Sequence, residues 1–335
     1  MRSIIDGSGA GVSERELRWG RLLRGMRSHA TLLTAAMALT LATGPPAAGD
    51  TLVHGDPSAE NLTAHGGVLM WSRRDAQGKH HLVQRVGTVA SDAPVASSEH
   101  AFDPDLGPAG KGRVVAVYER CRKGFRRCDL YRLNVTSGRE RRIRAVSTRA
   151  ASEFGASVWG ERYAFARQGP SREGLFTAAG GGTRFLGGSE VIQTDVRSRT
   201  IAAATYSAGE RVQVDVSGIY VHRVRSRGRG RSCLVDRGDQ GAEEGTALNS
   251  PVLDGGYVYW HDFTAAPSIV ERVVRAPLSS ACGRRPRIQA SDRTLPVGVD
   301  SIAVDRGAVY YTQGDYVDAA GVHVADAPPP RFAGG

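Results

Sequence analysis

Lysine and long apolar runs are both scarce in this chain. Only Lys79, Lys111 and Lys123 are lysine, so nearly all of the 44 Lys and Arg residues are arginine, and the formal net charge is +10. Such an excess of positive charge attracts anionic polymers, for example nucleic acid, a cell-wall polymer or an acidic polysaccharide. A GC-rich genome would also enrich Arg together with Ala, Gly and Val, so charge alone identifies no specific partner.

The longest apolar run without a charge covers residues 30–43, which is shorter than the roughly 20 residues that a membrane-spanning helix needs. Arginines within residues 21–27 precede the run, and the small residues of 45–49 follow it. This order predicts a secretory signal peptide cleaved near Ala48 or Gly49, the alternative being a retained N-terminal anchor. We therefore expect a secreted, extracytoplasmic protein with no membrane span in its mature chain.

Cysteine is also rare, and the chain lacks the Cys-x2-Cys spacing typical of tetrahedral zinc sites. An even number of cysteines in an exported chain indicates disulfides, and four cysteines allow three pairings. Cys121 and Cys128 lie between two apolar strands, so a hairpin would bring their Cα atoms within bridging distance. Cys233 and Cys282 then pair by elimination and connect two sequential repeats. We expect no metal site and no cofactor.

Sustained helical periodicity is missing beyond the N-terminus, so we expect little helix. A different unit recurs, clearest in residues 103–143: a turn, an apolar strand, a polar loop, a second strand, a Gly turn and a third strand. Successive copies are roughly 40–55 residues apart, which is the period of four-stranded propeller blades. The copies are anchored on Val68, Val115, Tyr163, Ile201, Val258 and Val309.

A single unit is unable to bury its apolar faces, so the units must stack around an axis. We predict an all-β protein, a β-propeller of six four-stranded blades, with a seventh possible between residues 226 and 249. A strand at 51–53 and the last strand near Val322 would share one blade and close the ring. An irregular pair of β-sandwiches is the alternative, but the regular return of a Gly-x-Val-aromatic pattern argues against it.

The predicted organisation has three parts. Residues 1–49 are an N-terminal extension with the signal peptide, residues 50–326 form the propeller, and residues 327–335 form a flexible tail. Hydrophobic residues make up 41% of the chain and charged residues 23%, which is typical of a globular protein and excludes a disordered one.

One repeat resembles the TolB-like (WD40-like) propeller repeat. The matching segments are 104–107 (Pro-Asp-Leu-Gly), 112–115 (Gly-Arg-Val-Val), 129–131 (Asp-Leu-Tyr) and 138–140 (Gly-Arg-Glu). The family pattern opens on Pro-x-x-Ser-Pro-Asp-Gly and continues with an apolar strand, an Ile-Tyr-x-x-Asp strand and a Thr-Gly-Glu turn. The resemblance implies a propeller scaffold. It transfers no functional residues, because propellers serve as binding modules and as enzymes alike.

Catalytic signatures are missing: the chain has neither a Gly-x-Ser-x-Gly nucleophile elbow nor a His-Glu-x-x-His zinc motif. We therefore predict no catalytic residue. Acidic residues near the starts of repeat units would converge on the channel and suit a cation or an acid/base pair, or they are turn-forming residues that bond the backbone. These acidic residues are Asp103, Asp105, Glu153, Asp195 and Asp254.

His261 and Asp262 follow two aromatic residues at the predicted end of a strand. They are further candidates for the mouth of the channel, or they are ordinary polar residues of a strand end. The candidates for the channel mouth are Asp103, Asp105, Asp254, His261 and Asp262.

The feature that points most directly to a function is a run of alternating arginines. If the run were extended, it would present all its guanidinium groups on one side and fit a polyanion. No aromatic residue interleaves with them, which argues against stacking on single-stranded nucleic acid. A solvated loop is the alternative. The five residues are Arg223, Arg225, Arg227, Arg229 and Arg231.

These observations favour a non-enzymatic, exported propeller that acts as a binding and interaction scaffold at the cell envelope. We expect a monomer whose partner is a protein or a cell-wall polymer, and we do not expect nucleic acid as the partner. The alternative is a propeller enzyme, a hydrolase or lyase of glycans or lactones, that uses acidic residues of the central channel. Carboxylates about 5–9 Å apart in that channel would favour the enzyme.

Overall fold

The computed structural model describes residues 50–122, 126–188, 190–207, 215–225, 230–240, 245–265, 268–314 and 321–325. The predicted signal peptide and C-terminal tail lie outside these residues. All regular structure in the described parts is β-strand. No helix in those parts is long and apolar enough to cross a membrane.

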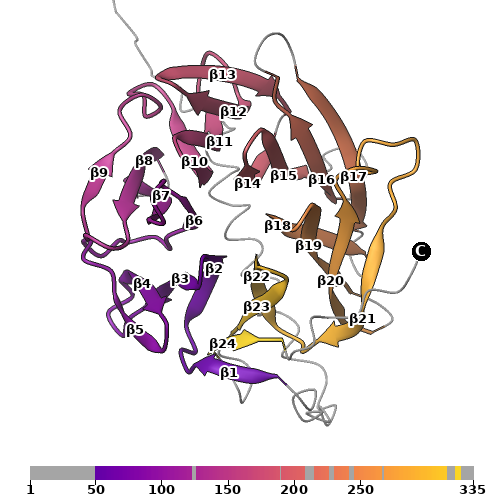
Figure 1. The fold of residues 1–335 in the computed structure, drawn as a ribbon, viewed down its shortest axis with the longest axis horizontal. Helices are drawn as coiled ribbons and strands as arrows, with labels where there is room; N and C mark the ends of the chain where they lie inside the picture. The colour runs from indigo at the N-terminus through magenta and orange to yellow at the C-terminus, as the bar shows by residue number, and fades with distance from the viewer. Residues whose placement is uncertain are drawn as a thin grey trace, which may run out of the picture. The chain divides into compact units, whose positions relative to one another are not determined.

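The strands form six four-stranded antiparallel sheets around an axis (Figure 1), so the predicted six-bladed propeller is confirmed. From the axis outward, blade 1 contains β2 (Ala59–His65), β3 (Val68–Arg74), β4 (His80–Val86) and β5 (Val89–Asp92). In the same order, blade 2 contains β6 (Asp105–Pro108), β7 (Val114–Arg122), β8 (Arg126–Asn134) and β9 (Glu140–Arg142). Blade 3 contains β10 (Ser152–Trp159), β11 (Arg162–Gln168), β12 (Gly174–Ala179) and β13 (Gly182–Gly187).

The second half of the ring repeats this order. Blade 4 contains β14 (Val191–Arg197), β15 (Thr200–Ser207), β16 (Asp215–Arg223) and β17 (Arg231–Gln240). Blade 5 contains β18 (Thr246–Asp254), β19 (Tyr257–Thr264), β20 (Val270–Pro277) and β21 (Gln289–Leu295). Blade 6 contains β22 (Val299–Asp305), β23 (Ala308–Gln313), β24 (Gly321–Val324) and, as its outermost strand, β1 (Thr51–His54).

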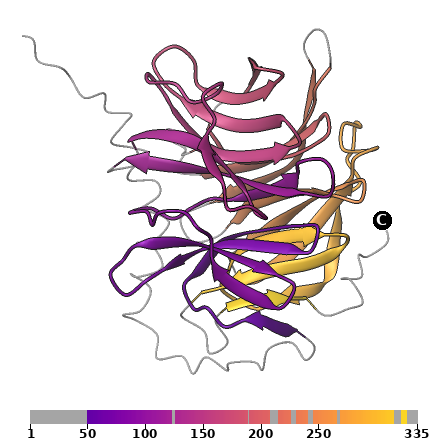
Figure 2. The ribbon, with the colours of Figure 1, turned by 60° about the vertical axis from the view of Figure 1, so that its left-hand side comes forward.

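Blade 6 closes the ring by combining both ends of the described chain, as predicted. Strand β1 pairs antiparallel with β24, with Thr51 opposite Val324 and Leu52 opposite His323. Figure 2 shows the indigo β1 beside the yellow strands of blade 6. Next to this strand, the Trp71 indole donates to Asp56 Oδ2 at 2.9 Å, which ties the entry of the chain to blade 1.

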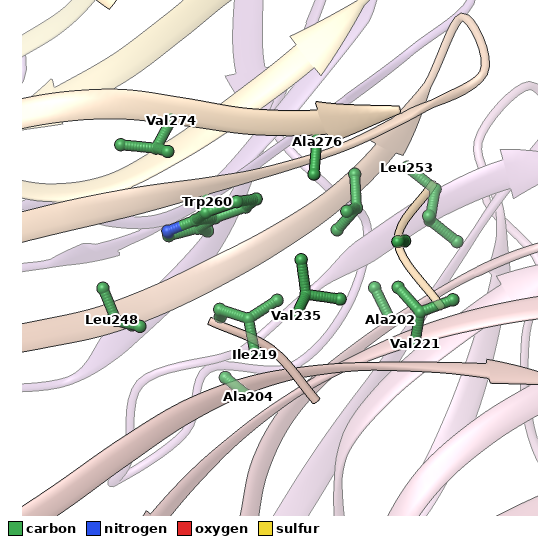
Figure 3. Packing of buried hydrophobic residues seen from close by; sticks show 12 residues of the cluster. Ala202, Ala204, Ile219, Val221, Val235, Leu248, Leu253, Trp260, Val274 and Ala276 are labelled. Carbon is green, nitrogen blue, oxygen red and sulfur yellow. The ribbon is translucent and has the colours of Figure 1, made fainter. Parts of the chain in front are cut away.

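The core lies between neighbouring blades. The residues that anchored the sequence repeat all fall in the second strand of their blades, where Trp71, Tyr118, Phe165, Trp260 and Tyr311 are fully buried. One cluster packs side chains of blade 4 against side chains of blade 5 around Trp260 (Figure 3). Each blade therefore needs its neighbours to remove its apolar surface from water.

The innermost strands differ from the sequence expectation. The segment at 103–107 was expected to be a turn, but Asp105–Pro108 is strand β6, the innermost strand of blade 2. Between residues 226 and 249, the described residues belong to β17 and to the start of β18, so the loose spacing there holds no seventh blade in the described residues. Inner strands carry polar side chains toward the axis, which removes the continuous apolar signal of a buried strand.

Both disulfides form as predicted. Cys121 and Cys128 connect β7 and β8 within blade 2, with their Cα atoms 3.9 Å apart. Cys233 in β17 pairs with Cys282, which follows β20, with their Cα atoms 5.2 Å apart. The second bridge therefore joins blade 4 to blade 5.

The two bridges should differ in their effect on stability, because they close loops of 7 and 49 residues. Loss of loop-closure entropy in the unfolded chain predicts a cost of about 4 kcal/mol for the double substitution C233A/C282A and about 2 kcal/mol for C121A/C128A. Denaturant unfolding of both variants and the wild type under oxidising conditions measures the difference. Equal losses in the two variants would contradict this loop-length explanation.

Candidate functional site

The six inner strands surround a cavity of about 190 Å³ on the propeller axis. Figure 1 shows β2, β6, β10, β14, β18 and β22 converging around the centre of the ring. The cavity lining is mostly polar and includes carboxylates, amides and guanidinium groups. Acidic lining residues are Asp103, Asp105, Asp195, Asp254 and Asp305, and basic lining residues are Arg197 and Arg306.

Irregular backbone at the axis allows the inner strands to approach one another closely. Asn61, Gly155 and Ser250 lie at bulges of β2, β10 and β18 and have φ values of 56°, 54° and 48°. At Gly155, a Cβ atom would collide with the carbonyl oxygen of Ile192 in blade 4. Glycine is therefore required at this position, both for its left-handed conformation and for the close contact between blades.

Most channel carboxylates bond to the backbone of a neighbouring blade. Asp105 Oδ2 accepts a hydrogen bond from the Val158 N–H at 2.7 Å, which joins blade 2 to blade 3. Three more aspartates repeat this arrangement, each toward the next blade of the ring. Asp195 accepts from the Leu253 N–H, Asp254 Oδ2 from the Gly307 N–H at 2.9 Å, and Asp305 Oδ2 from the Gly67 N–H at 2.9 Å.

Hydroxyl groups make further connections of this kind. Thr63 Oγ1 accepts from the Leu106 N–H at 3.1 Å and joins blade 1 to blade 2. Ser301 Oγ accepts from the Leu62 N–H at 2.8 Å and joins blade 6 to blade 1. The polar groups of the inner strands thus form inter-blade hydrogen bonds around the axis. These bonds hold neighbouring blades together.

The carboxylates also influence one another. Burial raises the pKa of Asp103 to about 7, and the charge of Asp300 contributes to this rise. Burial raises the pKa of Asp105 well above its usual value, and Asp195 adds to the effect. Burial raises the pKa of Asp195 to about 6. Protons are therefore held at the axis at pH values where exposed aspartates are ionised.

Three of the channel-mouth candidates, Asp103, Asp105 and Asp254, line the cavity. His261 and Asp262 lie instead in β19, the second strand of blade 5, and are not among the lining residues. His261 is buried, with its two ring nitrogens 3.1 Å from Asn249 Oδ1 and 3.0 Å from Glu271 Oε2. Asp262 forms an ion pair with Arg272 at 2.9 Å. Both side chains are thus engaged within their own blade.

A cluster of an arginine, a tryptophan and a histidine lies at the cavity edge and was not predicted from the sequence. The Arg197 guanidinium lies over the Trp159 ring at 5.2 Å and pairs with Asp254 at 2.6 Å. The His65 ring is nearly perpendicular to the same ring, with the centroids 5.6 Å apart. Because Arg197 covers one ring face, that face is not open for stacking on a ligand. The position of Trp159 directly before a Gly turn was the available sequence signal.

A distinct surface of the propeller carries the turns between first and second strands. We call it the hairpin face. The turns of adjacent blades lie together there, since the Gly67 and Gly307 N–H groups donate to Asp305 and Asp254. Connections between third and fourth strands reach the same face, because the third strand runs back parallel to the first.

The arginine run lies at one of these connections. Arg223 ends β16 and Arg231 begins β17, and the two residues are opposite each other in the antiparallel pairing. The two ends of the run therefore lie side by side, which excludes the single extended strand considered from the sequence. Arg225 is exposed, while Arg227 and Arg229 lie outside the described residues.

Comparison with known proteins identifies a fold and no more. No protein-family model matches the chain, and no curated protein sequence matches it. The putative TolB of Agrobacterium tumefaciens is similar in structure, with 13% identity, 83% of this chain and 94% of that protein covered, and a TM-score of 0.50. The fold is a TolB-like β-propeller.

A second similar structure shows how widely this TolB-like fold is used. The puromycin-hydrolyzing peptidase of Mycobacterium tuberculosis matches with 13% identity over 88% of this chain and a TM-score of 0.51. This chain covers 55% of the peptidase's length, so it corresponds to about half of that protein. At such identities the likeness concerns the scaffold, and function must be argued from the residues of this chain.

Metal binding has no support from the described residues, where no group of three His, Cys, Asp or Glu side chains comes together in a way that would hold an ion. The channel aspartates are spaced around the axis and bonded to different blades.

The raised pKa of Asp103 predicts that the stability of the protein depends on pH in a specific way. Asp103 has a folded pKa of about 7, above the value of about 4 for an unfolded chain. Its contribution to stability is therefore fully present below about pH 4 and is lost as the pH rises through about 7. Asp103→Asn removes this loss, so the stability of the variant relative to wild type should rise by about 3 kcal/mol as the pH increases from about 5 to about 8.

Chemical denaturation of both proteins at matched pH values measures this difference. Comparison at the same pH cancels the contribution of other groups, such as His222, whose pKa burial lowers to about 4. The control is Asp239→Asn at an exposed position, which should follow the wild-type curve. Parallel curves for wild type and Asp103→Asn would contradict the prediction.

Proposed function

We propose that the protein is an exported binding scaffold that holds a partner at the cell envelope. The observation that carries this proposal is the use of the channel carboxylates: Asp105, Asp195, Asp254 and Asp305 each accept a backbone N–H from a neighbouring blade. Carboxylates committed to holding the ring together are poorly placed to exchange protons with a substrate. A rigid ring with a polar cavity and exposed turns suits recognition.

Export is supported by two features that act together. Both pairs of cysteines form disulfides, which persist in oxidising compartments and are rare in the cytosol. A basic segment followed by a short apolar run precedes the described residues. Neither feature identifies the partner, which we take to be a protein or a polymer of the cell wall.

Co-sedimentation with isolated cell-wall material tests the scaffold role. The exported protein should pellet with the wall at low salt, and the bound fraction should fall as salt is added. Residues 50–335 carry 38 Lys and Arg against 31 Asp and Glu, so a net charge of +7 meets an anionic surface. The reduced, unfolded protein is the control, since it has the same charge without the ring. Equal binding of folded and unfolded protein, or no binding at low salt, would contradict the proposal.

One observation favours an enzyme as the second candidate. Asp103 has no hydrogen bond to a neighbouring blade among the described residues, and burial raises its pKa to about 7, a value suited to a general acid near neutral pH. An enzyme of this kind would cleave glycans or lactones at the cavity. Turnover of a glycan and lactone panel that disappears in Asp103→Asn would establish it, and equal turnover in the variant would exclude Asp103 as the acid.

A further inference from the structure

Exposed and half-exposed arginines gather on the hairpin face of three consecutive blades. They come from blade 3, from the turns and connections of blade 4, and from the loop that follows β20 in blade 5. We call this set the arginine track. It consists of Arg162, Arg184, Arg199, Arg223, Arg225, Arg231, Arg284, Arg285 and Arg287.

Hydrogen bonds connect the part of the track on blade 3 to the part on blade 4. The Arg184 guanidinium donates to the Arg225 carbonyl at 3.1 Å. The Val224 N–H donates to the Arg199 carbonyl at 2.8 Å, which places the β14–β15 turn beside the arginine run. Burial lowers the pKa of Arg162, and the nearby charges of Arg199 and Arg184 lower it further. The three guanidinium groups therefore lie near one another.

Further bonds connect blade 4 to blade 5. Arg223 donates to the Leu278 carbonyl, and Arg231 donates to the Cys282 carbonyl at 2.8 Å. The disulfide between Cys233 and Cys282 fixes the same loop to β17. The Leu278 N–H in turn donates to the Gly256 carbonyl in the β18–β19 turn, so this loop lies on the hairpin face.

Acidic residues are scarce along the track. The segments 180–188, 198–206, 218–235 and 278–290 contain no Asp or Glu. The nearest carboxylate in sequence, Glu161, pairs with Arg132 of blade 2 at 2.8 Å. Within the described parts of the chain, no ion pair involves Arg162, Arg199 or Arg225. The positive charges of these three arginines therefore have no ion-pair partner among the described residues, a costly arrangement that an anionic ligand would relieve.

Small residues keep the charged groups accessible. The turn between β12 and β13 is formed by Gly180 and Gly181, next to the strand that carries Arg184, and a Cβ atom at either position would touch nothing within 4 Å. No side chain therefore rises from this turn to screen the guanidinium groups.

We propose that the arginine track binds a flexible, linear polyanion of the wall or capsule type, with repeating phosphodiester or carboxylate groups. This deepens the scaffold role and rests on it. Arginine forms bidentate hydrogen bonds with both anionic groups and stays charged at every physiological pH. A ligand that spans three blades must follow the curved rim of the ring, which favours a flexible chain over duplex DNA with its persistence length of about 50 nm.

Single-stranded nucleic acid is the less favoured polyanion. Segments 223–231 and 278–288 contain no aromatic residue on which bases would stack. Base stacking on aromatic side chains supplies much of the affinity of single-strand binders.

Two sets of substitutions test opposite ends of the track in the full-length exported protein. One variant is R162A/R199A/R225A and the other is R284A/R285A/R287A. None of these six side chains forms a hydrogen bond or ion pair among the described residues, so neither set removes a contact that holds the ring together. The probe is long-chain inorganic polyphosphate, and affinity is measured over a salt series.

Wild type should bind polyphosphate with an affinity that falls steeply with salt, because binding releases condensed counterions. Each triple variant should bind about tenfold more weakly at low salt and should reduce the slope of log affinity against log salt by about 2. The control R74A/R144A/R149A removes the same charge from exposed positions on the face opposite the hairpin face. Its affinity for polyphosphate should stay within about twofold of wild type. An equal loss in the control would overturn the track.

Competition identifies the ligand chemistry. Poly-L-glutamate in place of polyphosphate distinguishes a carboxylate ligand from a phosphate ligand, and binding of either with the slopes above supports the track. Tighter binding of DNA than of both polymers would overturn it in favour of nucleic acid. Unchanged affinity in both triple variants would overturn it outright.

The wall assay separates this inference from the scaffold role. If the triple variants lose polyphosphate but wild type never pellets with the wall, the scaffold role fails and the track stands. If wild type and both triple variants pellet equally, the scaffold role stands and the track fails.

Discussion

The hydrogen bond that a backbone N–H donates to an inner-strand side chain of a neighbouring blade is the interaction on which this ring depends. Apolar packing between blades supplies most of the driving force, but it is not directional. The bonds from Asp105 to Val158 and from Thr63 to Leu106 fix how far each sheet stands from the axis and how the next one is turned. They also satisfy backbone donors that the close approach of the inner strands leaves without a ladder partner.

This use of the axis explains why function is better sought on the surface. Many propellers bind ligands in the central channel, yet in this protein the cavity carboxylates hold blades together and Arg197 covers a face of Trp159. The hairpin face is less constrained, since its turns are exposed and contribute little to the core. The exposed arginines of the arginine track lie on this face of blades 3 to 5.

The parts of the fold that were predictable are those with a local signal. Second strands such as Tyr257–Thr264 combine aromatic and β-branched residues after a Gly turn, and a chain with only four cysteines allows few pairings. Inner strands were harder to predict. A segment such as Asp105–Pro108 has the Asp, Gly and Pro that are typical of a turn, and the sequence alone does not show that its polar side chain faces the axis. The link between Arg184 and Arg225 was beyond any sequence argument, since it depends on which blades are neighbours in the ring.

Because blade 6 contains both the first and the last strand, the ring closes only when the chain extends through β24. Strand β1 is among the first segments of the propeller to be synthesised, but its partner β24 is nearly the last. Until then both β1 and the outer edge of β23 remain open, and unpaired strand edges invite association with other chains. A polypeptide truncated before Gly321 would leave the ring permanently open, so it would be prone to aggregation and proteolysis.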